Sequence, residues 1–480
     1  MIAPPTPAMP QEHWPPVAVI ILNYNGWRYL PTCLSALAAT DYPPEALDIV
    51  VVDNASHDDS VAQLHAEFPQ IRPLPLLRNT GFSGGNNAGI HATTAPYVVL
   101  LNNDTAVEPG WLKPLVRAAE SDPTVGACGA KLLFFYATLP LELTVAPHFV
   151  PAQALGGNDD RILGVRFHAA TLANEAIGAQ IGYGTGWYDV EGSGATAYRW
   201  SADRALLTLP VADVTTSLSI NLHFAGGPPA PLPPVQVQLS VGGTHLHTVE
   251  VGAAPLECTL TIPAELTQRA QRSIQNAGQE LLPGGYCRDR GSFVVDGVEQ
   301  HAPAGSYGQQ EEVFGLCGAA VLLRRTMLDE IGLLDERFFM YYEDIDLCWR
   351  ARFAGWRLLY VPQAVVRHIH SGSSGAWSPF FRFHVERNRL LMLVKNAPRR
   401  LAVQAISDYL HDTARWIGRS GRALRHDRRS AAAQWAFAHN NLRVLWALAV
   451  ALPALLRQRR FIRRNARTSD ATILHWMVKP

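Results

Sequence analysis

Three carboxylates stand among large apolar and aromatic side chains in residues 340–349: Glu343, Asp344 and Asp346. Charged side chains are rarely buried without a partner, and loss of water raises the pKa of a buried carboxyl group. A carboxylate in such surroundings can act as a general base near neutral pH. The first turn of a helix is the alternative interpretation, because the helix dipole favours acidic side chains there.

Polar side chains follow three apolar segments in the first quarter of the chain. The segments are 17–22, 49–52 and 97–101, and they end in Asn23, Asp53 and the run Asn102, Asn103, Asp104. Continuous apolar runs are typical of buried parallel strands, and helices are predicted between them at 29–39 and 60–68. Because ligands bind such sheets at the carboxyl ends of strands, we expect a ligand at this edge.

A glycine-rich segment, residues 78–89, lies between the second and third predicted strands. Glycines let backbone N–H groups approach a ligand, and the segment runs toward a helix whose N-terminus would favour a phosphate. It is neither a Walker loop, since no Gly-Lys-Ser/Thr follows, nor a dinucleotide fingerprint, since no strand leads directly into it. A flexible turn is the alternative interpretation.

The strand–helix rhythm stops between residues 136 and 272. Residues 218–224 and 235–241 alternate between apolar and polar side chains, and two glycines at 242–243 predict a hairpin turn into 246–251. This pattern predicts an inserted all-β sandwich domain. Four aromatic residues near its start would form either a sugar-stacking surface or part of the core: Trp187, Tyr188, Tyr198 and Trp200.

The α/β pattern then resumes. Residues 312–323 predict a glycine-containing turn that leads into a strand, and a helix is predicted from the acidic segment to about Gly355. A further strand at 357–361 is predicted to end at Pro362, and His368 and His370 follow it.

The C-terminal region is predicted to be helical and basic. From Arg382 onward the chain has 20 Lys and Arg against 5 Asp and Glu, although the net charge of the whole chain is zero. Arginines and tryptophans on amphipathic helices favour peripheral contact with a membrane surface, and a helical subdomain with solvated charges is the alternative. The apolar run 444–456 is too short to span a bilayer.

The overall composition is that of a globular protein. The 480 residues, 48% hydrophobic and 17% charged, suffice for two or three domains. Six scattered cysteines without a CxxC pair indicate a reducing cytosol and argue against a zinc or disulfide framework. The proline-rich first 15 residues lack the apolar core of a signal peptide. We therefore expect a cytoplasmic protein.

Four segments together resemble family 2 glycosyltransferases with the GT-A fold, in particular the bacterial rhamnosyltransferase-like branch. They are 51–56, 79–89, 101–105 and 338–350. The resemblance covers 16–135 and 273–400, with a weaker match to the tail, and leaves the β insertion outside. The implied organisation is a disordered tail (1–15), a nucleotide-sugar-binding part (16–135), an inserted β-sandwich (136–272), an acceptor and catalytic part (273–378) and a basic helical region (379–480). The implied α/β sheet is Rossmann-like and mostly parallel.

The resemblance implies an inverting enzyme that binds a nucleoside diphosphate sugar and Mn²⁺ or Mg²⁺. Asp344 matches the general base, and Glu343 would hold the acceptor or the loop. Asp104 and His368 match the metal ligands, with His370 in reserve. The metal motif departs from the family's Asp-x-Asp, because Asn102 replaces the first acid.

The remaining matched positions divide between donor and acceptor. Those on the donor side are Asn23, Tyr24, Asp53, Asn79, Gly81, Phe82, Asn102 and Asn103, and those on the acceptor side are Gly318 and Trp349. The resemblance implies dTDP-L-rhamnose as donor and a cell-envelope glycan or lipid-linked glycan as acceptor, with no nucleic acid partner.

Three alternatives remain open. The first is a transferase with another donor in place of dTDP-L-rhamnose, such as UDP-galactofuranose, UDP-glucose or UDP-N-acetylglucosamine. A catalytically inactive, sugar-binding scaffold is favoured by Asn102 and opposed by Asp344 and His368. A nucleotidyltransferase would be expected to carry a basic, glycine-rich loop after the first strand, and residues 23–26 do not form one.

Overall fold

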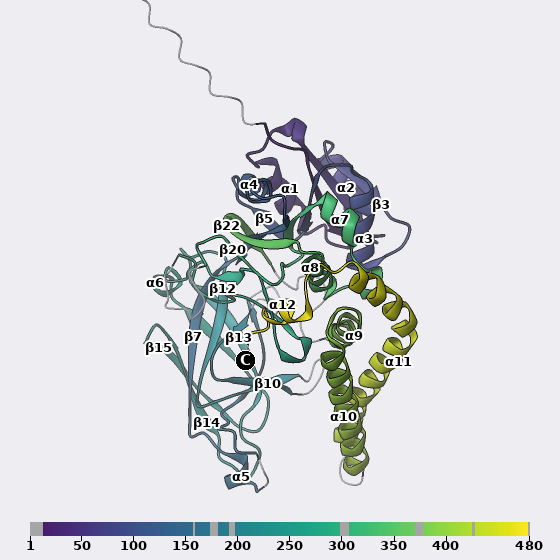
Figure 1. The fold of residues 1–480 in the computed structure, drawn as a ribbon. Coiled ribbons are helices and arrows are strands. Elements are labelled where there is room, and N and C mark those ends of the chain that lie inside the picture. Colours follow the sequence, from purple (N-terminus) through teal and green to yellow (C-terminus); the bar gives the residue numbers. More distant parts are fainter. Residues whose placement is uncertain are drawn as a thin grey trace, which may run out of the picture.

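The computed structural model describes residues 13–156, 159–172, 181–191, 197–297, 307–369, 378–424 and 428–478. These residues form an α/β body, a separate all-β domain and a group of C-terminal helices (Figure 1). The predicted fold class is therefore confirmed. Within the described residues, no helix is both long enough and apolar enough to cross a bilayer.

The sheet of the body is mixed. Its main strand order among the described residues is β20-β22-β6-β21-β4-β1-β2-β3, where β20 is Glu311–Glu312 and β22 is Arg357–His368. The half predicted from the apolar runs is parallel: β1 (Val17–Asn23) lies between β2 (Leu47–Asp53) and β4 (Tyr97–Asn102), with β3 (Arg72–Pro75) beyond β2. The other half adds antiparallel pairs, because β21 (Ala320–Arg324) runs against both β4 and β6 (Val125–Phe134).

Helices cover both faces of this sheet. One apolar cluster joins one face to α1 (Leu30–Ala38), α2 (Ser60–Glu67) and α4 (Leu112–Glu120). A second cluster joins the other face to α3 (Gly81–His91), α7 (Arg325–Ile331) and α8 (Glu343–Phe353). Burial on both faces explains why β1, β2 and β4 are continuous apolar runs.

The glycine-rich segment is helical, so the flexible turn is excluded. α3 begins at Gly81 and packs directly on β1. A Cβ atom on Gly85 would lie 2.2 Å from Leu22, and one on Gly89 would lie 2.3 Å from Ile20. These two glycines are therefore required for close packing of helix on strand.

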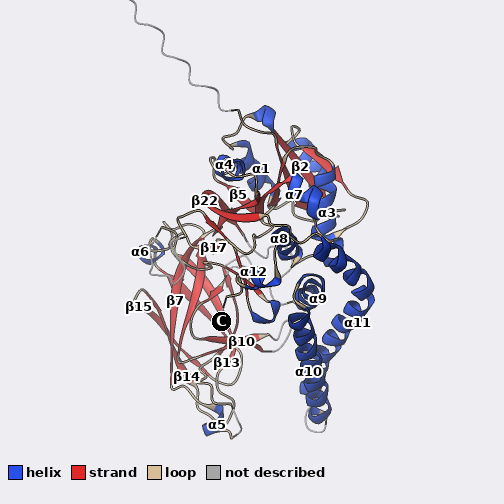
Figure 2. Ribbon diagram, in the orientation of Figure 1, coloured by secondary structure: helices blue, strands red, loops and turns tan. Residues whose placement is uncertain are grey.

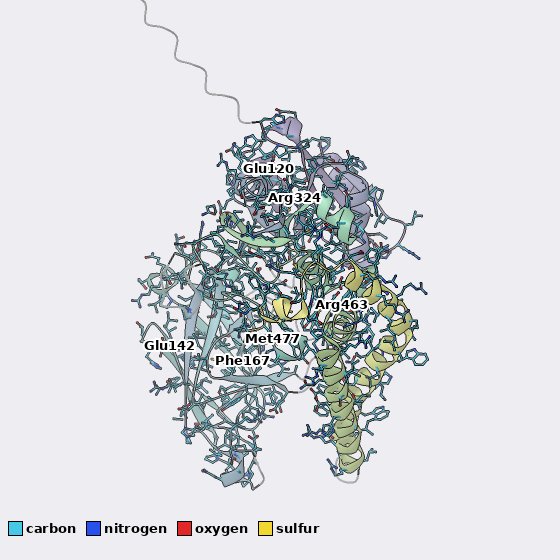
Figure 3. The ribbon with its side chains drawn as sticks, in the orientation of Figure 1. Glu120, Glu142, Phe167, Arg324, Arg463 and Met477 are labelled. Carbon is cyan, nitrogen blue, oxygen red and sulfur yellow. The ribbon has the colours of Figure 1, made fainter. Side chains whose placement is uncertain are left out.

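The inserted domain is a β-sandwich, as the alternating pattern predicts. Two antiparallel sheets enclose one apolar core, in which Phe167 (Figure 3) is wholly buried. The first sheet has the order β10 (Trp187–Glu191), β11 (Tyr198–Ser201), β8 (Arg166–Leu172), β13 (Leu218–Gly226), β16 (Leu256–Ile262). The second has the order β15 (Thr244–Val251), β14 (Val235–Val241), β7 (Ala137–Ala146), β12 (Arg204–Val211), β9 (Gly182–Tyr183). Figure 2 shows these strands set apart from the C-terminal helices.

The aromatic residues of this domain belong largely to its core. Trp200 is buried, and Trp187 packs on the apolar core and donates its indole N–H to the Leu206 carbonyl. Tyr198 and Tyr188 are partly buried and donate to Glu191 and to the Ile162 carbonyl. The four side chains therefore do not form an open stacking surface, and the core interpretation is favoured.

The chain returns to the body directly after the insertion. β17 (Ile274–Asn276) pairs with β6, and Ile274 lies opposite Leu133. A two-stranded hairpin follows, formed by β18 (Gln279–Leu281) and β19 (Cys287–Asp289). β22 (Arg357–His368) then runs parallel to β6. The prediction that this strand ends at Pro362 is wrong, because a register shift between Val361 and Val365 accommodates the proline.

The C-terminal helices are α9 (Pro379–Asn396), α10 (Arg399–Ala423), α11 (Arg428–Arg464) and α12 (Asp470–Leu474). α9 contacts α8, α10 and α11, and apolar residues of these helices form one buried cluster. Arg463 of α11 (Figure 3) donates to the Asn396 carbonyl at the end of α9 over 2.7 Å. The region is therefore packed on the body along one side.

Candidate active site

The ends of β1, β2 and β4 meet in one hydrogen-bonded group. Asn23 Nδ2 donates to Asp53 Oδ1 over 3.3 Å, and Asn103 Nδ2 donates to Asn23 Oδ1 over 2.9 Å. The Ser56 backbone N–H donates to the other Asp53 oxygen, and Tyr24 is 40% exposed beside Asn23. The polar residues at the three strand ends therefore lie at one edge, as parallel strands require.

The start of α3 is fastened to this edge. Asn79 Oδ1 accepts from Asn54 Nδ2 and from the Gly81 N–H, at 3.0 and 2.8 Å. Gly81 has φ +73°, and a Cβ there would lie 2.5 Å from the Phe339 carbonyl oxygen. Only glycine fits this position, both by conformation and by space. The Phe82 ring lies beside Gly318, which also borders Asp344.

Asp104 and His368 form a buried pair. Asp104 follows β4 and is 8% exposed, whereas His368 ends β22 and is 5% exposed. Asp104 Oδ1 lies 3.2 Å from His368 Nε2, and Asn102 Nδ2 lies 3.2 Å from the same nitrogen. Nδ1 of the ring lies 2.6 Å from Gln275 Oε1. The tertiary fold thus brings together the two residues predicted as metal ligands, although they are 264 positions apart in the sequence.

This donor set fits a divalent cation. When the ring proton is on Nδ1, Nδ1–H donates a hydrogen bond to Gln275 Oε1, and the Nε2 lone pair faces the Asp104 carboxylate. A metal-binding histidine is commonly fixed through its second nitrogen in this way. No group of three or more His, Cys, Asp or Glu gathers as a metal site among the described residues. Mg²⁺ sites of this kind leave positions for substrate phosphates. His370 lies outside the described residues.

Asp344 is half-buried at the start of α8. Its Oδ2 accepts from Gln279 Nε2 over 3.1 Å and from the Gly318 N–H over 3.3 Å, and its Oδ1 accepts from its neighbour Ile345 N–H over 2.8 Å. Burial raises the pKa of the Asp344 carboxyl, and these hydrogen bonds oppose the rise. The side chain also borders a narrow apolar cavity beside Phe82.

The neighbouring carboxylates differ from Asp344. Glu343 is 6% exposed, its Oε2 has no hydrogen-bond partner among the described residues, and burial raises its pKa well above the usual value. Asp346 is wholly buried and accepts from Arg350, Lys395 and Asn396 at 2.8–2.9 Å. Asp346 is therefore a structural residue, and Asp344 has the most solvent access of the three.

The segment after the insertion connects the two halves of the site. Gln275 contacts His368, and Gln279, four residues later, contacts Asp344. An extended chain of four residues spans at most about 14 Å, so the backbones of the two glutamines lie close together, with one side chain on His368 and the other on Asp344. The sequence prediction assigned neither glutamine to the site, because neither stands in one of the four motifs.

Asp289 is a further carboxylate that the sequence prediction missed. It lies directly opposite Gln279 in the β18–β19 hairpin and accepts from Asn276 Nδ2 over 2.7 Å. The pKa of Asp289 is raised to about 6, mainly by burial and in smaller part by the charge of Asp344, while the Asn276 hydrogen bond and His368 lower it. Asp289 therefore lies within electrostatic range of both halves of the site. Its only sequence signal is its position in a short strand after a Pro-Gly-Gly turn.

The backbone before Asp344 is strained. Phe339, Tyr341 and Tyr342 have φ values of +61°, +71° and +68°, which non-glycine residues adopt at a cost of roughly 1–3 kcal/mol each. Asn388 of α9 is wholly buried and places its amide nitrogen 2.7–2.8 Å from the carbonyl oxygens of Phe338, Met340 and Tyr341. The strained turn is thus held from α9.

Trp349, predicted on the acceptor side, is a core residue. It is wholly buried, and its ring packs edge-on against Phe314 within the cluster shared with α9. The prediction was wrong because Trp349 lies a turn and a half beyond Asp344 on α8, on the side that faces the C-terminal helices.

Two models of known protein families match parts of the chain. Residues 18–169 match a family model described as glycosyl transferase family 2, and residues 297–385 match one described as glycosyltransferase like family 2. Together they span about half of the 480 residues. The chain belongs to glycosyltransferase family 2. The first match extends beyond residue 135 into the β domain, further than the motifs themselves.

Individual relatives are similar over short stretches. An N-acetylglucosaminyl-diphospho-decaprenol L-rhamnosyltransferase of Mycobacterium tuberculosis is 47% identical over 60 residues, 12% of this chain and 20% of that protein. The rhamnosyltransferase WbbL of Escherichia coli is 32% identical over 96 residues, 20% of this chain and 36% of that protein. A glucosyl-dolichyl phosphate glucuronosyltransferase of Haloferax volcanii is 29% identical over 153 residues, which are 31% of this chain and 47% of that protein. The chain thus matches less than half the length of each of these relatives.

Proposed function

We propose that the protein is an inverting glycosyltransferase that moves a sugar from a nucleoside diphosphate sugar to an acceptor hydroxyl. The observation that supports this most is the arrangement of Asp344 and the Asp104–His368 pair. Segment 275–279 contacts both. The polar ends of β1, β2 and β4 supply a site for the nucleoside on the same edge of the sheet.

Asp344 is proposed as the general base. Its carboxylate would take the proton of the acceptor hydroxyl as that oxygen bonds to the anomeric carbon and the bond from this carbon to the diphosphate oxygen breaks. Attack from the face opposite the diphosphate inverts the anomeric centre. Burial raises the pKa of Asp344, which makes its carboxylate a better proton acceptor than an exposed one.

Asp104 and His368 are proposed to hold Mn²⁺ or Mg²⁺, with Asn102 beside them. When bound, this cation would supply positive charge to the diphosphate leaving group. Gln275 would keep the imidazole oriented toward the cation through its contact with Nδ1. The donor would lie between this pair, the nucleoside-binding strand ends and the Gly81–Phe82 turn.

We propose dTDP-L-rhamnose as the donor and a glycan or lipid-linked glycan of the cell envelope as the acceptor, with the protein at the cytoplasmic face of the membrane. The M. tuberculosis and E. coli relatives are named for rhamnosyl transfer, and the first is named for a lipid-linked acceptor. The Haloferax relative is named for another sugar, so UDP-linked donors are the competing choices.

The experiment is a thermal-shift screen of dTDP-L-rhamnose, UDP-galactofuranose, UDP-glucose and UDP-N-acetylglucosamine with and without Mn²⁺. A donor that binds only the folded protein raises its Tm. We expect the largest rise with dTDP-L-rhamnose and Mn²⁺, and an inverted anomeric centre in the transfer product by NMR. Absence of a shift with every sugar nucleotide would contradict the proposal and favour a sugar-binding scaffold.

A matched variant tests the metal assignment. Asp104→Ala should weaken donor binding at least tenfold in Mn²⁺ and leave the weak binding in EDTA unchanged, as measured by calorimetry. Asp41→Ala, which removes an exposed carboxylate paired with Lys113, is the control and should bind the donor as the wild type does. Equal Mn²⁺ dependence in Asp104→Ala and wild type would exclude Asp104 as a ligand.

A further inference from the structure

α11 has two apolar faces, and only one of them is covered. Val444, Leu448, Leu455 and Ile462 are buried against the body in the cluster shared with α9. Trp435, Leu442, Trp446 and Val450 lie on the opposite side and are 49%, 40%, 72% and 64% exposed. An amphipathic helix that only packs on a protein core would carry polar residues at these four positions.

Three arginines lie on the same side of α11 as these exposed apolar residues, beyond Pro453. With a rotation of 100° per residue, positions 435, 442, 446, 450, 457, 460 and 464 fall within an arc of about 80°. The last three positions are Arg457, Arg460 and Arg464, all exposed and without an ion pair to another described residue. We call these seven residues the outer face of α11. Figure 1 shows α11 at the periphery of the molecule, on the side away from the β-sandwich.

We propose that the outer face of α11 binds the surface of an anionic lipid bilayer, with its tryptophans at the headgroup level and its arginines on lipid phosphates. This inference rests on the proposed function, which places the protein at the membrane, and it names the surface that would make the contact. Tryptophan favours the interface between water and lipid, and helices with one apolar and one basic part lie in its plane. Each arginine near an anionic surface adds to the binding.

Charge decides between a bilayer and a second copy of the chain. The region from Arg382 onward carries 20 basic and 5 acidic residues. Two copies that joined through this face would bring their arginines together without acidic partners, whereas anionic headgroups neutralise them. The apolar part of the face therefore has its best partner in lipid.

The test is flotation of the full-length protein with vesicles, in the absence of any donor. One set contains phosphatidylcholine with 30% phosphatidylglycerol (about one lipid in three) and the other contains phosphatidylcholine alone. We expect binding to the anionic vesicles and at least tenfold weaker binding to the neutral ones. The variant R457Q/R460Q/R464Q should lose at least tenfold in binding to anionic vesicles, and so should W435S/W446S.

Two controls keep the result specific. Leu77→Ser removes a fully exposed apolar side chain between β3 and α3 and should leave vesicle binding unchanged. Asp344→Asn, expected to be inactive, should bind vesicles as the wild type does, so that failure of the membrane surface and failure of the transferase are separate outcomes. Circular dichroism and Tm must match the wild type for each variant.

Either of two results would overturn the proposal. One is wild-type flotation that is equal for anionic and neutral vesicles or absent from both. The other is a dimer by light scattering that W435S/W446S converts to a monomer while vesicle binding is absent, which would make the outer face of α11 a self-association surface.

Discussion

The two halves of the candidate active site are built differently. On the donor side, Asn23, Asp53 and Asn103 contact one another at the ends of adjacent strands, and ordinary sheet geometry brings them together. On the base side, Asp344 follows a turn with three positive φ values, and its position depends on Gln279 and on Asn388 of α9. The strand ends of the first half are held by the pairing of adjacent strands, whereas the base side is held by side chains of other elements.

The two halves should therefore respond differently when a substitution removes one of their contacts. Loss of one hydrogen bond at the strand ends leaves the strands fixed by the sheet. Loss of a contact to the strained turn lets the backbone relax toward ordinary φ values and moves the base. We therefore expect the base side to be more sensitive to residues that never contact a substrate.

The largest effect is expected at the proposed base itself. Asp344→Asn should lower kcat about 10²- to 10⁴-fold because the amide cannot take the acceptor proton. Donor affinity by calorimetry should stay within about twofold, since the donor side is held independently. Undiminished turnover of this variant would show that Asp344 is not the base. The comparison between a donor side and a base side would then fail as well.

The matched change two residues later, Asp346→Asn, should lower the stability of the fold rather than act on kcat directly. Asp346→Asn breaks a buried group of Arg350, Lys395 and Asn396, and a broken buried ion pair typically costs about 3–5 kcal/mol. Lys395 keeps its ion pair with Asp335, whereas Arg350 loses its carboxylate partner. A fall in Tm and in the urea midpoint should accompany this change. If Asp346→Asn instead left the midpoint intact and abolished transfer, the two carboxylates would have exchanged roles.

A smaller effect is expected at the residue that holds the turn. Asn388→Ala removes the donor to the carbonyls of Phe338, Met340 and Tyr341 and should lower kcat about tenfold, with donor KM little changed. A purely structural role would lower Tm and leave kcat per folded molecule and its pH profile as in the wild type. Asn23→Ala on the donor side is the comparison variant and should raise the donor KM instead.

The smallest effect is a pH-dependent one at Asp289. Its pKa is raised to about 6 in the fold, above the unfolded value near 3.8, so the folded state prefers the protonated acid. Its contribution is therefore unfavourable above pH 6 and vanishes below about pH 4. Asp289→Asn should raise stability at pH 8, by about 1 kcal/mol after solvent screening, and change nothing at pH 4. Equal Tm values for Asp289→Asn and the wild type at pH 8 would show that the Asp289 carboxylate is solvated.

Much of this protein follows from its sequence. Continuous apolar runs predict the buried strands β1, β2 and β4, and alternation predicts β13, β14 and β15, because burial on one or both faces dictates the pattern. Strand ends in Asn23, Asp53 and Asp104 locate the edge of the sheet that carries the site. The acidic segment forms the first turn of α8, as the helix interpretation of that segment predicts, and the role of Asp344 as a base stays a prediction.

Tertiary structure alone decides which carboxylate does what. Two positions along a helix correspond to a rotation of about 200°, so the side chains of Asp344 and Asp346 point in nearly opposite directions. Asp344 faces the edge of the candidate site, while Asp346 faces the buried basic residues under α9. The sequence around them is equally acidic and gives no sign of this. Gln275, Gln279, Asp289 and Asn388 reach the site only through β pairing and helix packing, since neighbours in space need have no relation along the chain.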